Sequence, residues 1–350
     1  MISRNSYTRR SSVSRPKVFV SRLISEVALS KVRAVCDVEI WTEPLPPPRD
    51  VFLRKIEGKD GLLTLVTESP IDGTVMDAAG PQLKVISNFA VGCNNINIQD
   101  ATSRGICVGN TPGVLTEATA DMAFGLLISA ARCILNGADD VRNGRWKTWE
   151  PLRYIGQDLI GKTIGIVGMG RIGYAVGKRC RGGWNMEVLY SDIVRNEYAE
   201  KELGARRVDF DTLLGASDFV SVHADLNAQT KGMFNLATFK KMKNTAVFVN
   251  AARGPIHVTA DLVTALKEGI IFAAGLDVTD PEPPRYSDAS DATNELMKLP
   301  NAVIVPHIAS ASVNSRNGMA DIAADNLIAG LTDEPLRCWV NPEVASRRRR

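Results

Sequence analysis

Short apolar runs recur along the chain and alternate with longer segments of helical periodicity. Four runs rich in β-branched and large apolar residues predict strands in the first hundred residues, at 17–20, 38–41, 62–66 and 83–87. A second series predicts six further strands, at 163–167, 186–190, 219–222, 246–249, 272–276 and 302–305. Strands that alternate with helices are typical of parallel sheets covered by helices on both faces. The pattern therefore predicts two separate α/β sheets.

Two long helices are predicted outside this alternation. The first covers 117–135, after the breaker Asn110-Thr111-Pro112-Gly113, and Thr116 is placed to cap it. Because this helix lies between the two strand series, we expect it to bridge two domains. The second covers 310–331, after the last predicted strand, from where it can return to the first domain.

Length, composition and charge are those of an ordinary two-domain globular protein. At 350 residues the chain exceeds the usual size of a single core, and its 45% hydrophobic and 23% charged residues leave no case for widespread disorder. The net charge of +3 favours no nucleic-acid partner, and no stretch reaches the roughly 18 apolar residues of a membrane helix. Six scattered cysteines without a CxxC pair indicate reduced thiols, so we expect a soluble, cytoplasmic protein.

Both ends of the chain are basic. We predict a disordered extension over 1–16 and a solvated tail over 345–350. The extension contains Ser and Arg but no acidic residue, so organelle targeting stays open.

A glycine turn follows the first strand of the second series. Gly168, Gly170 and Gly173 come directly after 163–167 and open a helical stretch. The first glycine permits a tight turn, the second lets a pyrophosphate approach the backbone, and the third lets helix and strand pack closely. The N-terminus of the helix adds free N–H groups for the phosphates. This order of strand, turn and helix predicts a dinucleotide site.

Asp192 ends the next predicted strand, about 20 residues beyond the glycines, where a carboxylate holds the adenosine ribose hydroxyls. A carboxylate there repels a 2′-phosphate, which favours NAD over NADP. Two alternatives stay open: Asp192 only starts a turn, or the nearby Arg195 accepts NADP.

One of the three histidines is a strong acid/base candidate. His307 follows the strand 302–305 and so lies at the carboxyl edge of its sheet, where open α/β folds bind ligands. His223 ends a buried strand and His257 lies near a helix start, and both are interpreted as structural residues.

Arg253 and Glu282 follow the ends of neighbouring predicted strands and converge with His307 on one sheet edge. Reduction of a 2-keto acid needs a cation for the carboxylate and a proton donor for the developing alkoxide. Arg253 suits the first role because it is always charged and binds bidentately. His307 suits the second, and Glu282 can orient the imidazole and keep it protonated near neutral pH.

With these residues placed, the chain resembles the D-isomer-specific 2-hydroxyacid dehydrogenases, and among them most closely the glyoxylate and hydroxypyruvate reductases. The resemblance runs from about Lys17 to Val344. Besides the glycine turn, its ordered motifs are Val91-Gly92-Cys93-Asn94-Asn95, Asn110 to Thr116, Asn250-Ala251-Ala252-Arg253-Gly254, Gly275-Leu276-Asp277-Val278 and Pro306-His307-Ile308-Ala309-Ser310-Ala311.

The resemblance implies a fold of two doubly wound parallel-sheet domains. A Rossmann NAD-binding domain over 113–303 is expected to be inserted into a flavodoxin-like substrate domain over 17–112 and 304–344. It also suggests a homodimer through the nucleotide domain, with no metal, nucleic acid or membrane involved.

The resemblance further implies that Arg253, Glu282 and His307 are the catalytic residues. The implied cofactor positions are Thr116, Gly168, Gly170, Arg171, Ile172, Gly173, Asp192, Ala251 and Asp277, the last at the nicotinamide carboxamide. The implied substrate positions are Leu65, Val66, Val91, Gly92, Trp149, Arg253 and His307, with backbone at Val91 and Gly92 receiving the carboxylate. Trp149 is similar to a tryptophan that a partner subunit lends to the pocket, or else it is an ordinary core or interface residue.

Some positions depart from the family pattern. The family commonly has proline where Asp225 stands, and a Phe-Glu pair where Thr279 and Asp280 follow Val278. These differences leave the detailed structure of the cofactor loop undecided, but they do not affect the three catalytic candidates. NADP-preferring reductases often carry Ser or Arg where Asp192 stands, which again favours NADH.

The sequence thus predicts NADH-dependent reduction of glyoxylate or hydroxypyruvate to glycolate or D-glycerate, with the proton from His307. The choice of keto acid stays open, because one methylene or hydroxyl changes discrimination by only about 1–3 kcal/mol. One alternative is an NAD-sensing, corepressor-like interaction protein of the same fold. Another is a related enzyme such as a phosphoglycerate or 2-ketogluconate dehydrogenase, the former less favoured because no segment long enough for a regulatory module follows Val344.

Overall fold

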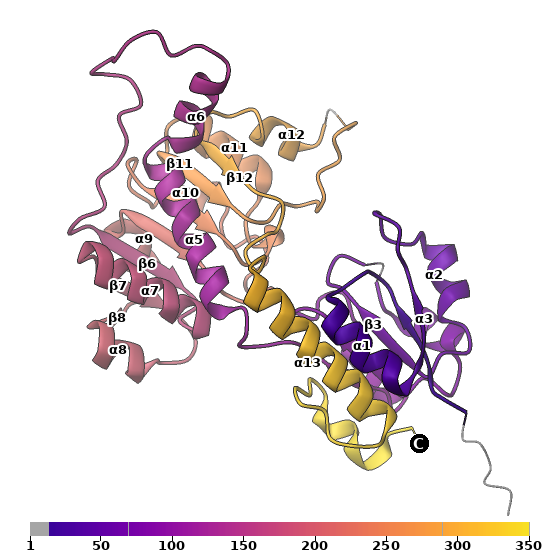
Figure 1. Cartoon of the computed structure of the whole chain (residues 1–350). Helices are drawn as coiled ribbons and strands as arrows, with labels where there is room; N and C mark the ends of the chain where they lie inside the picture. Colours follow the sequence, from indigo (N-terminus) through magenta and orange to yellow (C-terminus); the bar gives the residue numbers. More distant parts are fainter. Residues whose placement is uncertain (1–13, 69, 289, 350) are drawn as a thin grey trace, which may run out of the picture. The chain divides into compact units, whose positions relative to one another are not determined.

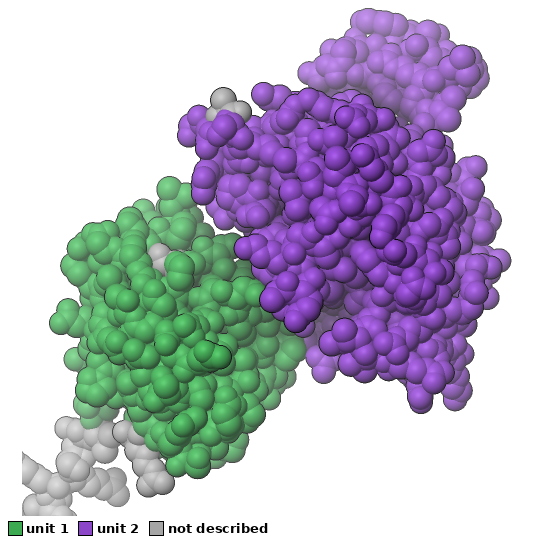
Figure 2. Space-filling model, turned by 180° about the vertical axis from the view of Figure 1, so that it is seen from behind, with its two compact units in different colours: residues 1–112, 317–350 green, residues 113–316 purple. Residues whose placement is uncertain are grey.

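The chain forms two compact units, each built on a parallel sheet. The computed structural model describes residues 14–68, 70–288 and 290–349. Unit 1 comprises residues 1–112 and 317–350, and unit 2 comprises residues 113–316 (Figure 1, Figure 2). Unit 2 is therefore inserted into the sequence of unit 1.

Among its described residues, unit 1 has a sheet of five parallel strands in the order β2-β1-β3-β4-β5. This is the flavodoxin-like order. The strands are β1 (Lys17–Val20), β2 (Asp37–Ile40), β3 (Gly61–Thr64), β4 (Val85–Asn88) and β5 (Cys107–Gly109). The helices are α1 (Glu26–Val35), α2 (Arg49–Ile56), α3 (Gly73–Ala79) and α4 (Ile98–Ser103), with a 3-10 helix η2 (Pro342–Arg347) near the end.

In the described part of unit 2, seven parallel strands follow the order β8-β7-β6-β9-β10-β11-β12, which is the Rossmann order with one further strand. The strands are β6 (Thr163–Val167), β7 (Glu187–Ser191), β8 (Arg206–Arg207), β9 (Phe219–Val222), β10 (Val247–Asn250), β11 (Ala273–Leu276) and β12 (Ala302–Ile304). The two-domain fold inferred from the sequence is confirmed.

The helices of unit 2 flank both faces of its sheet (Figure 1). They are α5 (Thr116–Ala131), α6 (Ile134–Arg142), α7 (Arg171–Trp184), α8 (Glu197–Leu203), α9 (Phe210–Ala216), α10 (Leu236–Phe239), η1 (Gly254–Ile256), α11 (Thr259–Lys267) and α12 (Ala292–Leu296). The last long helix, α13 (Val313–Leu331), begins in unit 2 and ends in unit 1.

Alternate residues of the unit 2 strands face two different apolar cores. Val247 and Val249 of β10 belong to the core formed with α5 and α7, whereas Phe248 between them belongs to the core formed with α10 and α11. A strand buried on both faces reads as a continuous apolar run. This is why most strands of unit 2 stand out in the sequence.

The predicted helix 117–135 is two helices. α5 ends at Ala131 and α6 begins at Ile134, because Cys133 takes a left-handed conformation with φ of 52°. Thr116 is the first helical residue and not the cap, a position that Leu115 occupies without a side-chain bond. Within the described residues no single helix is long and apolar enough to cross a membrane, and only as a pair bent by 71° do α5 and α6 reach that length and composition.

The second boundary between the units lies later than the sequence indicates. It falls between Arg316 and Asn317, whereas the expected substrate domain resumes at residue 304. The segment after β12 stays with unit 2 because its backbone is bonded to the end of β11: His307 N–H donates to the carbonyl of Asp277 at 2.9 Å.

Of the predicted solvated tail, Ala345, Ser346 and Arg347 are exposed, whereas Arg348 and Arg349 are partly buried. Val344 is fully buried, and the Arg349 guanidinium donates to the carbonyls of Arg104 at 2.6 Å and Gly80 at 2.9 Å. Backbone carbonyls of neighbouring loops thus hold the Arg349 side chain, and a run of arginines in the sequence gives no sign of such acceptors. Of the predicted extension, residues 1–13 lie outside the described residues, and Arg15 donates to the carbonyl of Cys36 at 2.8 Å.

Candidate active site

The glycine turn joins β6 to α7 and each of its glycines has a separate steric reason. Gly168 has φ of +92°, and a Cβ there would lie 2.7 Å from the backbone nitrogen of Ala224. A Cβ on Gly173 would lie 2.2 Å from the carbonyl oxygen of Gly168. A Cβ on Gly170 would meet nothing within 4 Å, so this residue keeps open the space at the N-terminus of α7. A dinucleotide pyrophosphate needs that space and the free N–H groups beside it.

Asp192 is bonded to the glycine turn. Its Oδ2 accepts from Met169 N–H at 2.7 Å, and its Oδ1 accepts from Val194 N–H at 2.9 Å. Arg195, the residue that could allow NADP as the cofactor, is paired with Glu200 at 2.7 Å. The carboxylate thus stays beside the turn and Arg195 is engaged with Glu200, while the nearby Arg207 guanidinium donates to the backbone carbonyl of Asp192 at 2.7 Å.

Arg253, Asp277 and His307 all follow carboxyl ends of adjacent strands in unit 2. The register pairs Asn250 of β10 with Leu276 of β11, and Leu276 with Ile304 of β12. The three strands therefore end side by side, at the same sheet edge as the glycine turn after β6. This is the edge at which open α/β sheets bind ligands.

Asp277 fixes the loop that carries His307. The carboxyl group is buried, and burial raises its pKa. Its two oxygens accept from the backbone N–H groups of Ile308 at 2.7 Å and Ala309 at 3.0 Å. His307 adopts φ of 49°, a left-handed conformation that these bonds hold in place.

The structure brings Glu282 and His307 together. Glu282 Oε1 bonds to Nδ1 of the imidazole, and both side chains are about a quarter exposed. This contact orients the ring and leaves Nε2 as the nitrogen that can serve a ligand.

The Arg253 segment is held by Asn250, a residue that the sequence analysis named only within a motif. Asn250 Oδ1 accepts from Ala252 N–H at 3.0 Å, and its Nδ2 donates to the carbonyl of Arg253 at 2.9 Å. The next residue, Gly254, packs directly on the segment that leads to Glu282, because a Cβ there would lie 1.9 Å from the carbonyl oxygen of Thr279.

In unit 1, the expected substrate residues lie on two loops that asparagines connect. Leu65 and Val66 follow β3, and Val91 and Gly92 follow β4. Asn95 joins the two loops, because its Nδ2 donates to the carbonyl of Leu65 at 2.9 Å. Asn88, the last residue of β4, holds the loop that follows it, because its Nδ2 donates to the carbonyl of Gly92 at 2.8 Å. Asn88 and Asn95 also bond to each other at 3.3 Å. Sequence reasoning missed Asn88 altogether.

Trp149 lies on an exposed part of unit 2 that we call the arm (residues 134–160). Figure 1 shows α6 and the loop after it extending away from the sheet. Asp140, largely buried, accepts hydrogen bonds from Arg145 at 2.6 Å and from Arg153 and Tyr154, and so folds the loop onto α6. Trp149 itself is 79% exposed.

Of the other two histidines, His257 is buried and His223 is partly buried. Burial lowers the pKa of His223 and that of His257 to about 4, so both rings are neutral at physiological pH. His223 Nε2 bonds to Ser221 Oγ at 2.8 Å. Neither ring is placed to exchange protons with solvent.

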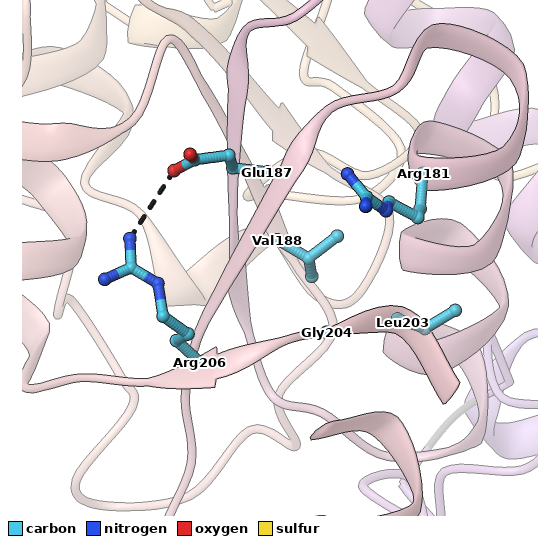
Figure 3. Close-up of a pocket in the computed structure, with 6 residues that line it drawn as sticks. All are labelled: Arg181, Glu187, Val188, Leu203, Gly204 and Arg206. Carbon is cyan, nitrogen blue, oxygen red and sulfur yellow. Dashed lines mark hydrogen bonds and ion pairs between the residues drawn. The ribbon is translucent and has the colours of Figure 1, made fainter. Parts of the chain in front are cut away.

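A surface hollow of about 190 Å³ lies at the opposite end of the unit 2 strands (Figure 3). Its lining residues are Arg181, Glu187, Val188, Leu203, Gly204 and Arg206. Glu187 begins β7 and pairs with Arg206 at 3.4 Å. Since ligands bind at the carboxyl ends of such strands, the hollow has no part in the candidate site. No three His, Cys, Asp or Glu side chains in the described ranges cluster as metal ligands would.

Comparison with known proteins agrees with this geometry. The NAD-binding domain model of the D-isomer specific 2-hydroxyacid dehydrogenases matches residues 124–309. A glyoxylate reductase of Thermococcus litoralis is 46% identical over 334 residues, covering 94% of this chain and 98% of that protein.

Solved structures agree over most of the chain. A Thermus thermophilus protein is 41% identical with a TM-score of 0.85, covering 93% of this chain and 99% of that one. An NADPH-dependent glyoxylate/hydroxypyruvate reductase from Sinorhizobium meliloti is 30% identical with a TM-score of 0.78, covering 96% and 99%. With its NAD-binding Rossmann domain, this chain is an oxidoreductase acting on 2-hydroxy acids, and it belongs to the D-isomer specific 2-hydroxyacid dehydrogenase family.

Proposed function

We propose that this chain reduces glyoxylate or hydroxypyruvate with NADH, giving glycolate or D-glycerate. The contact between Glu282 and Nδ1 of His307, at the carboxyl edge of the NAD-binding sheet, carries this proposal. The 46% identity with the Thermococcus glyoxylate reductase supports a small 2-keto acid as the substrate.

The proposed roles follow from the charge that develops on the keto acid. When bound, NADH supplies a hydride to carbon 2. His307 donates a proton from Nε2 to the carbonyl oxygen, so that one hydride and one proton convert C=O into CH–OH. Glu282 stabilises the imidazolium through Nδ1, and Arg253 holds the substrate carboxylate and polarises the carbonyl.

The loops of unit 1 are proposed to set substrate size. The backbone N–H groups of Val91 and Gly92 receive the carboxylate, and Leu65 and Val66 limit the length of the keto acid. The bonds of Asn88 and Asn95 support this role, because they hold both loops in one conformation.

We infer a preference for NADH from the surroundings of Asp192. Its carboxylate stays beside the glycine turn, where it repels a 2′-phosphate, and the nearby Arg195 is paired with Glu200. Further cofactor contacts are proposed for Thr116, Arg171, Ile172, Ala251 and Asp277. The NADPH dependence of the Sinorhizobium relative makes this preference the first point to measure.

We also propose a homodimer formed through the arm. Five large apolar side chains of its loop are each at least 63% exposed, namely Trp146, Trp149, Leu152, Ile155 and Ile160. Such a concentration of exposed apolar surface marks an interaction site. In a dimer, Trp149 would reach the substrate pocket of the partner subunit.

The test is NADH and NADPH oxidation by the purified chain with glyoxylate, hydroxypyruvate, phosphohydroxypyruvate and 2-ketogluconate. We expect turnover of the first two with NADH, and loss of most of it in His307→Ala. A chain that binds NADH but consumes none with any of these acids would support the NAD-sensing interaction protein instead. Preference for NADPH would overturn the interpretation of Asp192, and full activity of His307→Ala would overturn the mechanism.

A further inference from the structure

His257 lies buried beside the segment that carries Arg253. It follows η1 directly, its backbone N–H donates to the carbonyl of Gly254 at 3.1 Å, and the residue is 2% exposed. Its ring stands edge-on to Phe248 of β10, 6.0 Å between centroids. His257 therefore packs between β10 and the turn that carries Arg253.

The hydrogen bonds of Asn250 determine which ring nitrogen of His257 carries the proton. The amide nitrogen of Asn250 has two N–H groups, and it donates to the carbonyl of Arg253 at 2.9 Å and meets His257 Nδ1 at 3.0 Å. Because the amide nitrogen can only donate, Nδ1 must accept and the ring must carry its proton on Nε2. The low pKa of this buried ring, about 4, keeps it in that neutral form.

We propose that His257 is a positioning residue for Arg253: its Nδ1 fixes the Asn250 amide, which in turn binds both sides of the Ala252–Arg253 peptide segment. The inference rests on the proposed function, in which Arg253 holds the substrate carboxylate. It adds a residue that does not itself touch substrate or cofactor.

The surroundings of the turn make the Asn250 amide sensitive to this bond. If the Asn250 amide rotated by half a turn, its NH₂ group would face the N–H of Ala252 and its oxygen would face the carbonyl of Arg253. Both hydrogen bonds to the turn would then be lost together. The turn cannot shift toward the Glu282 segment, because Gly254 already lies against Thr279 there. The carbonyl of Asn250 also accepts from Asp277 N–H at 3.0 Å, which ties this residue to the loop of His307.

Three substitutions separate positioning from mere packing. His257→Leu fills the space but removes the acceptor. His257→Asn places an acceptor oxygen where Nδ1 stands, and His257→Gln places one an atom further out. We expect His257→Leu and His257→Gln to raise the KM for glyoxylate about tenfold, the scale of one buried hydrogen bond, with a smaller change in kcat. His257→Asn should restore most of the affinity.

Two readouts exclude a general loss of structure. Because Ala251, a proposed cofactor contact, lies in the same turn, the KM for NADH is compared with the KM for glyoxylate: in His257→Leu and His257→Gln it should rise clearly less than the KM for glyoxylate, whereas a general disturbance of the NAD-binding domain would raise both alike. In an Arg253→Ala background, His257→Leu should have no further effect on kcat/KM, because residues that act through one another are not additive.

The outcomes are distinct. An unchanged KM in His257→Leu, no rescue by His257→Asn, or a full additional loss in the Arg253→Ala background would overturn the positioning role. If His257→Leu fails to fold, the comparison of His257→Gln with His257→Asn decides the matter in the same way. If Arg253→Ala alone leaves glyoxylate reduction intact, the proposed function of Arg253 fails, and that result is separate from those for His257.

Discussion

Asp277 is buried at the end of β11, yet both of its carboxylate oxygens accept from backbone N–H groups of the His307 loop. Asn250 does the same for the Arg253 turn, and Asn95 for the Leu65 loop. In each case a short, buried side chain fixes the backbone of a loop that carries a candidate functional residue. Such bonds are made before any ligand arrives, so the loops are preorganised.

The carboxylate of Glu282 should matter through its charge as well as its position. Glu282→Gln keeps an acceptor oxygen for His307 Nδ1 but removes the charge that stabilises an imidazolium. We expect kcat for glyoxylate to fall by about 10²-fold, within the usual range for an acid/base group. Steady-state kinetics checks this, with NADH affinity as the control. A Glu282→Gln enzyme with the parental kcat would exclude the proposed role of the Glu282 charge.

Two glycines of the same turn should respond differently to alanine. Gly170→Ala places its Cβ in open space, so the fold should be retained while NADH binding weakens, because the methyl group occupies the space proposed for the pyrophosphate. Gly173→Ala places its Cβ 2.2 Å from a backbone oxygen, so thermal stability should fall. Melting temperature and NADH titration distinguish the two variants. If Gly170→Ala bound NADH as tightly as the parent, the pyrophosphate could not occupy the space beside Gly170, and the proposed binding position would be wrong.

Among the secondary-structure elements, those with a strong apolar pattern could be predicted and those without one could not. The bounds of β1, β6 and β9 agree with the sequence prediction. β8 consists of two exposed arginines and carries no apolar signal. β5 is only three residues long. Edge pairing in such short strands depends on neighbours that a local pattern does not reveal.

Residues of the candidate site likewise divide into those that the sequence pattern could predict and those that it could not. The positions of Gly168, Asp192 and His307 at strand ends could be predicted because each follows a recognisable strand. Asn88 and the role of His257 could not, because a side chain that bonds to the backbone of another loop has no spacing rule in the sequence. The contact of Glu282 with His307 spans 25 positions, yet it could be predicted because both residues follow the ends of neighbouring predicted strands.

The arm offers a test at the scale of one element. Trp149→Ser combined with Leu152→Ser removes two of its most exposed apolar side chains and leaves the Asp140 cluster untouched. We expect the proposed dimer to dissociate at micromolar concentration, as measured by light scattering after size-exclusion chromatography. The matched control is Tyr198→Ser, an exposed aromatic residue on α8 outside the arm. A double variant with the parental mass would place the interface elsewhere.

For the whole molecule, the two units should respond to pH in opposite directions. In unit 2, burial lowers the pKa of His223 and of His257 from 6.5 to about 4, so the unfolded chain binds protons first. Stability from these groups is complete above about pH 6.5 and is lost as the pH falls toward 4. In unit 1, burial raises the pKa of Glu68 from 4.5 to about 7, although Arg22 lies 3.5 Å away. That stability is complete below pH 4.5 and is lost as the pH rises through 7.

Acidification from pH 7 to 5 should therefore weaken unit 2, on the order of 3 kcal/mol from the two histidines, and strengthen unit 1. Hydrogen exchange followed by mass spectrometry, corrected for intrinsic rates, reports each unit separately. Glu68→Gln should abolish the pH response of unit 1 and leave that of unit 2 unchanged. A parallel loss of protection in both units on acidification would contradict this account.

The insertion of unit 2 also has a consequence for synthesis on the ribosome. β5 lies at the edge of the unit 1 sheet, and its outer side is completed by residues near the other end of the chain: Val340 N–H donates to the carbonyl of Val108 at 2.8 Å, and the Asn341 side chain bonds to Val108 and Ile106. These residues emerge only after all of unit 2 has been made. Synthesis of unit 1 therefore begins first, but its folding can be completed only last. Unit 2 is continuous in sequence and can fold on the ribosome before unit 1 is complete.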